Sequence, residues 1–160
     1  MNAELIELAR DVGAFLQSRH WCLATAESCT GGLVATVVTE IAGSSEWFDR
    51  SFVTYSNEAK IEMLGVRTET LARYGAVSEE TVGEMVAGVL DRSHADIAVA
   101  ISGIAGPSGG TPAKPVGTVC LAWMTRGGEQ RCLTRRFEGD RAQVRLSAAM
   151  QALREIMKFT

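Results

Sequence analysis

Three short segments of the chain carry side chains and backbone amides that could bind a ligand or do chemistry. The first is Thr25-Ala-Glu-Ser-Cys-Thr-Gly-Gly32, where an apolar, strand-like run passes into a helical pattern. A hydroxyl at Ser28 would project from the edge of a sheet. The amides of Thr30, Gly31 and Gly32 would point from the helix N-terminus and make an anion or oxyanion site. The alternative is that Ser28 or Thr30 only caps the helix.

The second segment is Val53-Thr-Tyr-Ser-Asn-Glu-Ala-Lys60, at the end of another strand-like run. Asn57 and Lys60 are three residues apart, so both could face one cleft from the start of a helix. Lysine is scarce in this chain, since the others are Lys114 and Lys158. An ordinary surface lysine remains the alternative.

The third segment runs from Gly103 to Gly117 and holds every proline of the chain. It follows the most apolar strand-like run, and ligands of α/β proteins bind at the carboxyl ends of strands. Glycine allows close backbone approach, and proline fixes the path of a loop. The composition therefore predicts a rigid loop that lines a ligand site rather than a plain connection. Neither a P-loop nor a dinucleotide-binding glycine pattern is present.

Histidine and cysteine chemistry have few candidates here. The chain has His20 and His94, neither near these segments, so we expect neither a Ser-His-Asp triad nor a metal site. The cysteines lack CxxC spacing. Cys29 adjoins Ser28 and is a rival nucleophile, because thiols attack amides and a helix N-terminus lowers a thiol pKa.

Composition sets the class of protein. The chain has 160 residues, 46% of them hydrophobic and 22% charged, with a net charge of −3. These values are typical of a single soluble domain over residues 1–160. No apolar run is long enough for a membrane helix, and the charged first turns do not resemble a secretory signal, so we expect a cytoplasmic protein.

Basic residues gather toward the C-terminus, although the total charge is acidic. Arg141 and Arg145 are four residues apart and would share a helix face. Two guanidinium groups suit one phosphate but not a nucleic-acid duplex. We therefore expect no nucleic acid. A small-molecule phosphate at Arg141 or Arg145 would account for the basic C-terminal region, and the alternative is an ordinary strand and helix that carry arginines.

Periodicity predicts an α/β fold with a mixed sheet, because helices and strands alternate early and a hairpin follows. Helices are expected over 3–18, 30–41, 57–64, 68–74, 79–91 and 140–157. Strands are expected over 21–26, 50–56, 96–102, 117–124 and 131–137.

Taken together, these segments resemble the CinA C-terminal-domain family. The resemblance extends over about residues 5–155 and is carried by these blocks of sequence: Thr25–Leu33, Gly43-Ser44-Ser45 with Phe48, Val53–Lys60, Gly75–Ser78, Ser102–Pro107 and Lys114–Thr118. It implies a three-layer α/β/α sandwich with about five strands. It also implies hydrolysis of the carboxamide of nicotinamide mononucleotide (NMN) to nicotinic acid mononucleotide and ammonia, without a cofactor or a metal.

The resemblance also implies the site residues. Ser28 would be the nucleophile and Lys60 its base, with Tyr55, Asn57 and Glu46 in family-like positions near them. Tyr55 could relay a proton or orient Lys60, and Glu46 could hold a polar group or the lysine. Substrate would further contact the loop residues Ser102, Gly103, Ile104, Ala105 and Gly106. A homo-oligomer is expected.

Two other classes of function remain open at this point. The chain could be a nucleotide-binding module without catalysis, using the same glycine-rich loops. It could instead be an interaction domain recruited by DNA-uptake or recombination machinery, as the competence-related name of the family suggests. The acidic total charge counts against direct contact with DNA.

Overall fold

A mixed sheet forms the centre of the computed structural model, which describes residues 1–160. Its order is β2-β1-β3-β4-β5. The strands are β1 (Leu23–Glu27), β2 (Phe48–Val53), β3 (Ile97–Gly103), β4 (Thr118–Thr125) and β5 (Gln130–Arg136). β1 pairs in parallel with β2 and β3, whereas β3, β4 and β5 pair in antiparallel fashion. Parallel strands need crossover connections, and the helices between these three strands supply them.

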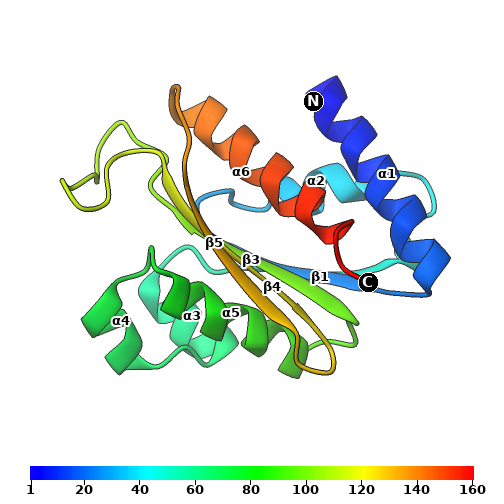
Figure 1. Ribbon diagram of the computed structural model, residues 1–160, viewed down its shortest axis with the longest axis horizontal. Coiled ribbons are helices and arrows are strands. Elements are labelled where there is room, and N and C mark those ends of the chain that lie inside the picture. The colour runs from blue at the N-terminus through cyan, green and yellow to red at the C-terminus, as the bar shows by residue number, and fades with distance from the viewer.

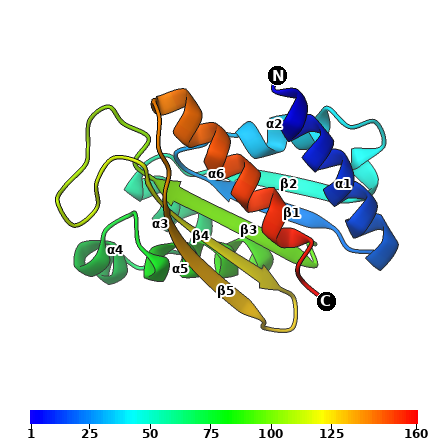
Figure 2. The same ribbon diagram turned by 45° about the horizontal axis from the view of Figure 1, so that its top comes forward.

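Helices cover both faces of the sheet (Figures 1 and 2). One face, called here the α6 face, packs against α1 (Ala3–Arg19), α2 (Leu33–Thr39) and α6 (Arg141–Ile156). The other, called the α5 face, packs against α3 (Asn57–Leu64), α4 (Thr68–Tyr74) and α5 (Glu79–Asp91). The expected three-layer α/β/α sandwich is therefore confirmed. No helix has both the length and the apolarity needed to span a membrane.

Several helices begin at side-chain caps that the sequence supplies. Ser56 accepts a hydrogen bond from the Ala59 amide at the start of α3, and Ser78 caps α5 in the same way. Asp140 and Gln143 form a capping box at the start of α6. Such caps satisfy amides that have no partner within the helix. The caps of α3 and α6 fix where these helices begin and therefore where the side chains of Lys60 and Arg141 are placed.

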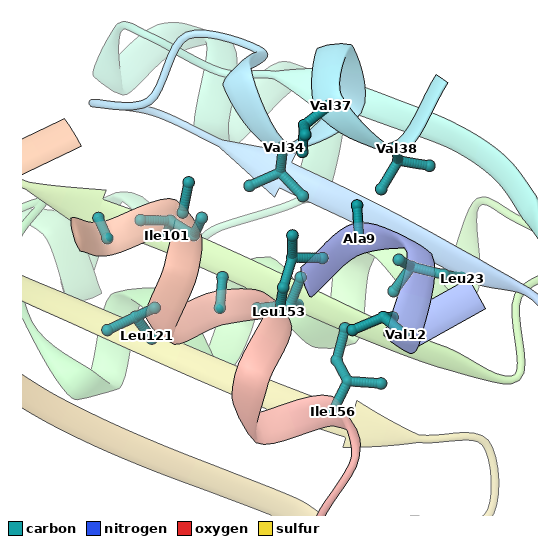
Figure 3. Close-up of a cluster of buried hydrophobic side chains, with 14 of the residues drawn as sticks. Ala9, Val12, Leu23, Val34, Val37, Val38, Ile101, Leu121, Leu153 and Ile156 are labelled. Carbon is teal, nitrogen blue, oxygen red and sulfur yellow. The ribbon is translucent and has the colours of Figure 1, made fainter. Parts of the chain in front are cut away.

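The core is divided by the sheet. On the α6 face, β1 and β3 present large aliphatic side chains to the helices, and Figure 3 shows Leu23 and Ile101 among them with valines of α2. On the α5 face the same strands present Ala24, Ala26, Ala98 and Ala100. Side chains alternate across a strand, so each strand contributes to both layers. The small residues let α5 lie close to the sheet.

One element differs from the sequence expectation in a way that matters for the site. Helix α2 begins at Leu33 rather than at residue 30, and residues 28–32 form a turn that joins β1 to α2. Gly31 and Gly32 have positive φ angles of 58° and 98°, which end the strand without starting a helix. Ser28 therefore lies at the beginning of this turn.

Candidate active site

A hydrogen bond between Ser28 and Lys60 lies at the carboxyl end of β1. The Nζ atom of Lys60 is 3.0 Å from the Oγ atom of Ser28 and donates to the main-chain oxygen of Thr54 at 2.9 Å. Lys60 reaches the strand end from the first turns of α3. Its side chain is 1% exposed and Ser28 is 7% exposed. The structure thus brings together the two residues that the sequence nominates as base and nucleophile.

The charge state of Lys60 follows from its surroundings. Burial lowers the pKa of this lysine below its ordinary value, because the charged form loses hydration. No carboxylate forms an ion pair with it. A neutral amine has a lone pair that can accept the Ser28 hydroxyl proton, while one of its N–H groups donates to Thr54.

A cavity of about 300 Å³ opens in front of this pair. It lies between the carboxyl ends of β1 and β3, the start of α3 and the loop that follows β3. Its lining contains these residues: Ser28, Cys29, Tyr55, Asn57, Lys60, Ala76, Val77, Ser102, Gly103, Ile104, Ala105, Gly106, Ser108, Gly109 and Arg141. The predicted loop residues 102–106 are all among them.

Ser102 lies beside Ser28 on the neighbouring strand. Glu27 pairs with Ile101 in the register of β1 and β3, so Ser28 and Ser102 are the next residues on each chain. Ser102 is 1% exposed and lines the cavity. Its hydroxyl forms no hydrogen bond within the protein, which leaves it available to a ligand.

Backbone N–H groups at the cavity are free to donate hydrogen bonds to a negatively charged atom, but they are not the amides of residues 30–32 that the sequence suggests. The amide of Gly31 donates to the Ser28 carbonyl oxygen at 3.0 Å, and neither Thr30 nor Gly32 lines the cavity. The delayed start of α2 turns these amides away. Instead, Ala105 and Gly106 line the cavity with main-chain N–H groups that have no acceptor in the protein. The Cys29 amide, next to the nucleophile, is likewise without an acceptor.

Arg141 lies at the mouth of the cavity, at the start of α6. Its guanidinium donates to the Gly106 carbonyl oxygen at 2.8 Å and to the Tyr55 hydroxyl at 3.1 Å. Tyr55 is 62% exposed and makes no hydrogen bond to Lys60. The structure therefore places Tyr55 with Arg141 at the rim, rather than in a proton relay with the lysine. Asn57 is exposed on the same rim.

Arg145 does not share this position. One turn further along α6, its guanidinium donates to the main-chain oxygens of Cys29 at 3.0 Å and Thr30 at 3.1 Å. It does not line the cavity. The backbone of the 28–32 turn occupies the Arg145 guanidinium, and the phosphate contact expected at Arg141 or Arg145 stays a prediction.

Glu46 is placed away from the site. It ends a short 3₁₀ helix, Ser44–Glu46, just before β2, and accepts a hydrogen bond from Gln17 at 3.1 Å. The first residue of β2, Phe48, pairs with the first residue of β1. Since the strands are parallel, Glu46 lies at their amino ends, whereas Ser28 follows the carboxyl end of β1.

Cys29 has the chemistry of a buried thiol. Its side chain is 6% exposed and belongs to the core on the α6 face. Burial raises the pKa of this thiol to about 11, despite the opposing effects of its own amide and of Arg145. The thiol is protonated at neutral pH, which weakens it as a nucleophile. Ser28 is therefore the better candidate.

One buried charged residue beside the site was not singled out from the sequence. Glu27 is fully buried, and its carboxylate accepts hydrogen bonds from the Thr30 hydroxyl and from the amides of Val34 and Ala35. The signal was a carboxylate at the end of an otherwise uncharged buried run, where an acidic residue needs specific partners. No group of three or more His, Cys, Asp or Glu side chains is arranged to hold a metal ion.

Comparison with known proteins agrees with this geometry. The family model for the CinA C-terminal domain matches residues 5–160. The nicotinamide-nucleotide amidohydrolase PncC of Escherichia coli K12 is 57% identical over 157 residues, covering 97% of this chain and 94% of that protein. PncC of Enterobacter agglomerans is 54% identical over 158 residues, covering 96% of each chain.

The fold has a solved counterpart. The crystal structure of the competence/damage inducible protein CihA from Agrobacterium tumefaciens superposes with a TM-score of 0.96 at 46% identity. The match covers 99% of this chain and 96% of that one. Both the sequence match and the shared fold extend over nearly all of the chain, including every segment that lines the cavity. The chain therefore belongs to the CinA C-terminal domain family.

Proposed function

We propose that this protein is a nicotinamide-nucleotide amidohydrolase that uses Ser28 as nucleophile and Lys60 as general base. The single observation that carries the proposal is the 3.0 Å hydrogen bond between Ser28 and a buried lysine without an acidic partner. The names of the relatives from E. coli and E. agglomerans supply the substrate class.

The reaction begins when Lys60, as a neutral amine, takes the Ser28 hydroxyl proton. The Oγ atom then bonds to the carboxamide carbon, and the carbonyl oxygen becomes an oxyanion. Lys60 returns the proton to the departing nitrogen as the C–N bond breaks, which releases ammonia and leaves a serine ester. Water then attacks the ester while Lys60 takes a proton from that water. Lys60 passes this proton to the Ser28 oxygen as the ester C–O bond breaks, so the acid is released and the enzyme is restored.

The oxyanion needs hydrogen-bond donors that hold no other partner. The free amides of Cys29, Ala105 and Gly106 meet this requirement. Donors of this kind typically lower the barrier by roughly 3–4 kcal/mol each. The hydroxyl of Ser102 provides a further contact for the carboxamide, beside the nucleophile.

The nucleotide portion of the substrate would lie toward the mouth of the cavity. Arg141 is the one arginine in the lining, and its fork can pair with phosphate oxygens. Tyr55, Asn57 and Ser108 surround it with polar groups. These residues would distinguish the nucleotide from the free base.

The test is release of ammonia from NMN in the presence of EDTA. We expect wild-type protein to release it, and Ser28→Ala and Lys60→Ala to lower the rate by a factor on the order of a thousand or more. Cys29→Ala is the matched control, because it removes the neighbouring nucleophile and should retain most of the rate.

The other outcomes separate the rival functions. Activity in Ser28→Ala that disappears in Cys29→Ala would assign the attack to the thiol. NMN binding with no release of ammonia from wild-type protein would favour a nucleotide-binding module. Salt-sensitive binding of DNA without either property would favour an interaction domain. A cytoplasmic location, a homo-oligomeric state and a single domain over residues 1–160 stay predictions from the sequence.

A further inference from the structure

The turn that carries Ser28 is held from the α6 face, opposite the face from which Lys60 approaches. Side chains alternate along β1, so Glu27 points to the α6 face while Ser28 points to the α5 face, where Lys60 approaches. Arg145, on α6, reaches the same turn from the α6 face. We propose that Glu27 and Arg145 are positioning residues that set the geometry of Ser28 and the adjacent Cys29 amide.

Glu27 fixes the far end of the turn. One carboxylate oxygen accepts from the Thr30 hydroxyl at 2.8 Å and from the Val34 amide at 2.9 Å, and the other accepts from the Ala35 amide at 3.0 Å. Gly32, the N-cap residue of α2, has no side chain to supply this cap. The carboxylate therefore joins the end of β1 directly to the start of α2.

Arg145 fixes the near end of the turn. Its guanidinium donates to the carbonyl oxygens of Cys29 and Thr30, which belong to the second and third peptide groups after Ser28. The first peptide group, which contains the Cys29 amide, is held by the Gly31 amide, which donates to the Ser28 carbonyl oxygen. A carbonyl and the next amide of the same peptide plane point in opposite directions. Holding these carbonyls on one side therefore limits the rotation of the backbone around the nucleophile.

Neither side chain enters the cavity, so neither is a catalytic residue. Misplacement of reacting groups by about 1 Å can cost roughly a hundredfold in rate. Loss of either residue should therefore lower kcat while substrate binding at Arg141 and Tyr55 persists. This inference rests on the proposed function, since it assumes that Ser28 attacks the carboxamide.

The experiment compares kcat and KM for NMN in Glu27→Gln, Arg145→Gln and Arg145→Lys. A glutamine at position 27 places its NH₂ group where one carboxylate oxygen accepts a hydrogen bond, so at least one donor loses its acceptor. We expect kcat to fall roughly 10- to 100-fold in Glu27→Gln and Arg145→Gln, with KM changed less than about threefold. Arg145→Lys can keep one of the two carbonyl bonds, so its kcat should lie between wild type and Arg145→Gln.

Matched controls separate positioning from general destabilisation. Arg154→Gln removes an exposed arginine from the same helix. Glu84→Gln removes a carboxylate that also accepts a backbone amide, that of Arg67, and a threonine hydroxyl, but far from the cavity. Both should leave kcat within about twofold of wild type, even where the melting temperature falls. The acid limb of the pH–rate profile should not move in any variant, because neither Glu27 nor Arg145 contacts Lys60.

The outcomes are distinguishable from failure of the proposed function. If wild-type protein releases ammonia and Ser28→Ala does not, yet kcat is unchanged in the folded Arg145 variants, the inference is wrong and the function stands. A rise in KM with unchanged kcat in Arg145→Gln would assign this arginine to the substrate phosphate and also overturn the inference. If Glu27→Gln does not fold, the two Arg145 variants decide the question.

Discussion

In the proposed mechanism a single side chain, Lys60, determines whether Ser28 can be activated at neutral pH. A lysine in water is almost fully protonated there and has no lone pair to offer. Burial favours the neutral form, and here it acts without an opposing carboxylate. In the proposed mechanism Lys60 takes the role of the histidine that serine hydrolases often use, in a chain where neither histidine lies in the cavity.

The pKa of Lys60 predicts the pH dependence. The base is active when deprotonated, so kcat/KM should rise with pH through the lowered pKa of this lysine and level off above it. The profile should be measured for wild type and for Cys29→Ala, which should share the same acid limb. The nucleoside should be tested beside NMN, because a phosphate also titrates near pH 6. A rate that falls as pH rises through neutrality would contradict the assignment of Lys60 as base.

For individual residues, the sequence indicated which side chains could belong to the site better than it indicated which contacts they make. Ser28, Lys60 and the 102–106 loop lie in motifs that resemble a known family, and this resemblance predicts them as site residues. Glu46 and Arg145 lie outside the cavity, and the sequence could not show this because their contacts depend on which end of a strand and which turn of a helix faces the site. Periodicity alone does not determine either.

Among the elements, α5 positions the catalytic helix α3 by close packing. A Cβ atom at Gly88 would lie 2.0 Å from the carbonyl oxygen of Leu64, the last residue of α3. The glycine is therefore required by the distance between two helices, and a backbone atom cannot move aside as a side chain can. Lys60 belongs to the same helix as Leu64, so a shift of α3 at this contact is expected to move it.

We expect Gly88→Ala to destabilise the protein by about 1–3 kcal/mol through overpacking and to lower kcat by shifting α3. Gly83→Ala, on the same helix, is the control. Its Cβ atom would meet only the end of the Gln130 side chain, at 3.2 Å, and alanine favours a helix interior over glycine by up to about 1 kcal/mol. Urea unfolding and kcat should be measured for both variants. Equal losses in the two would show that the Leu64 contact is not the cause.

Most element boundaries could be predicted from caps and periodicity, and the start of α2 could not. The composition of the segment after β1 is compatible with a helix from residue 30. In the structure its two glycines adopt positive φ angles, and the helix begins only after them. This is the point at which local propensity yields to the geometry of the nucleophile.

Over the whole molecule, the cavity is lined by residues of the turn after β1, of β3, α3 and α6, and of the loop after β3. A ligand that binds there contacts both layers and stabilises the folded state as a unit. The inactive Ser28→Ala protein allows this to be measured with the substrate intact. At a concentration of NMN near one hundred times its Kd, stabilisation should be about 2.7 kcal/mol, which raises Tm by roughly 5–10 °C.

The same measurement locates the phosphate. Arg141→Gln in the Ser28→Ala background should lose most of the difference in Tm between NMN and its nucleoside, whereas Arg145→Gln should keep it. An unchanged difference in the Arg141 variant would remove this arginine from the binding site.

The alternation of Glu27 and Ser28 across β1 has a consequence for how such a protein can change during evolution. Removing or adding one residue within the strand would exchange the two faces and present a carboxylate where the hydroxyl belongs. Insertions and deletions within β1 are therefore expected to be excluded. The loop over residues 107–113, exposed over most of its length, is free of this restriction. Variation in the size of acceptable substrates should therefore be recorded in the length of that loop, while the length of β1 stays constant.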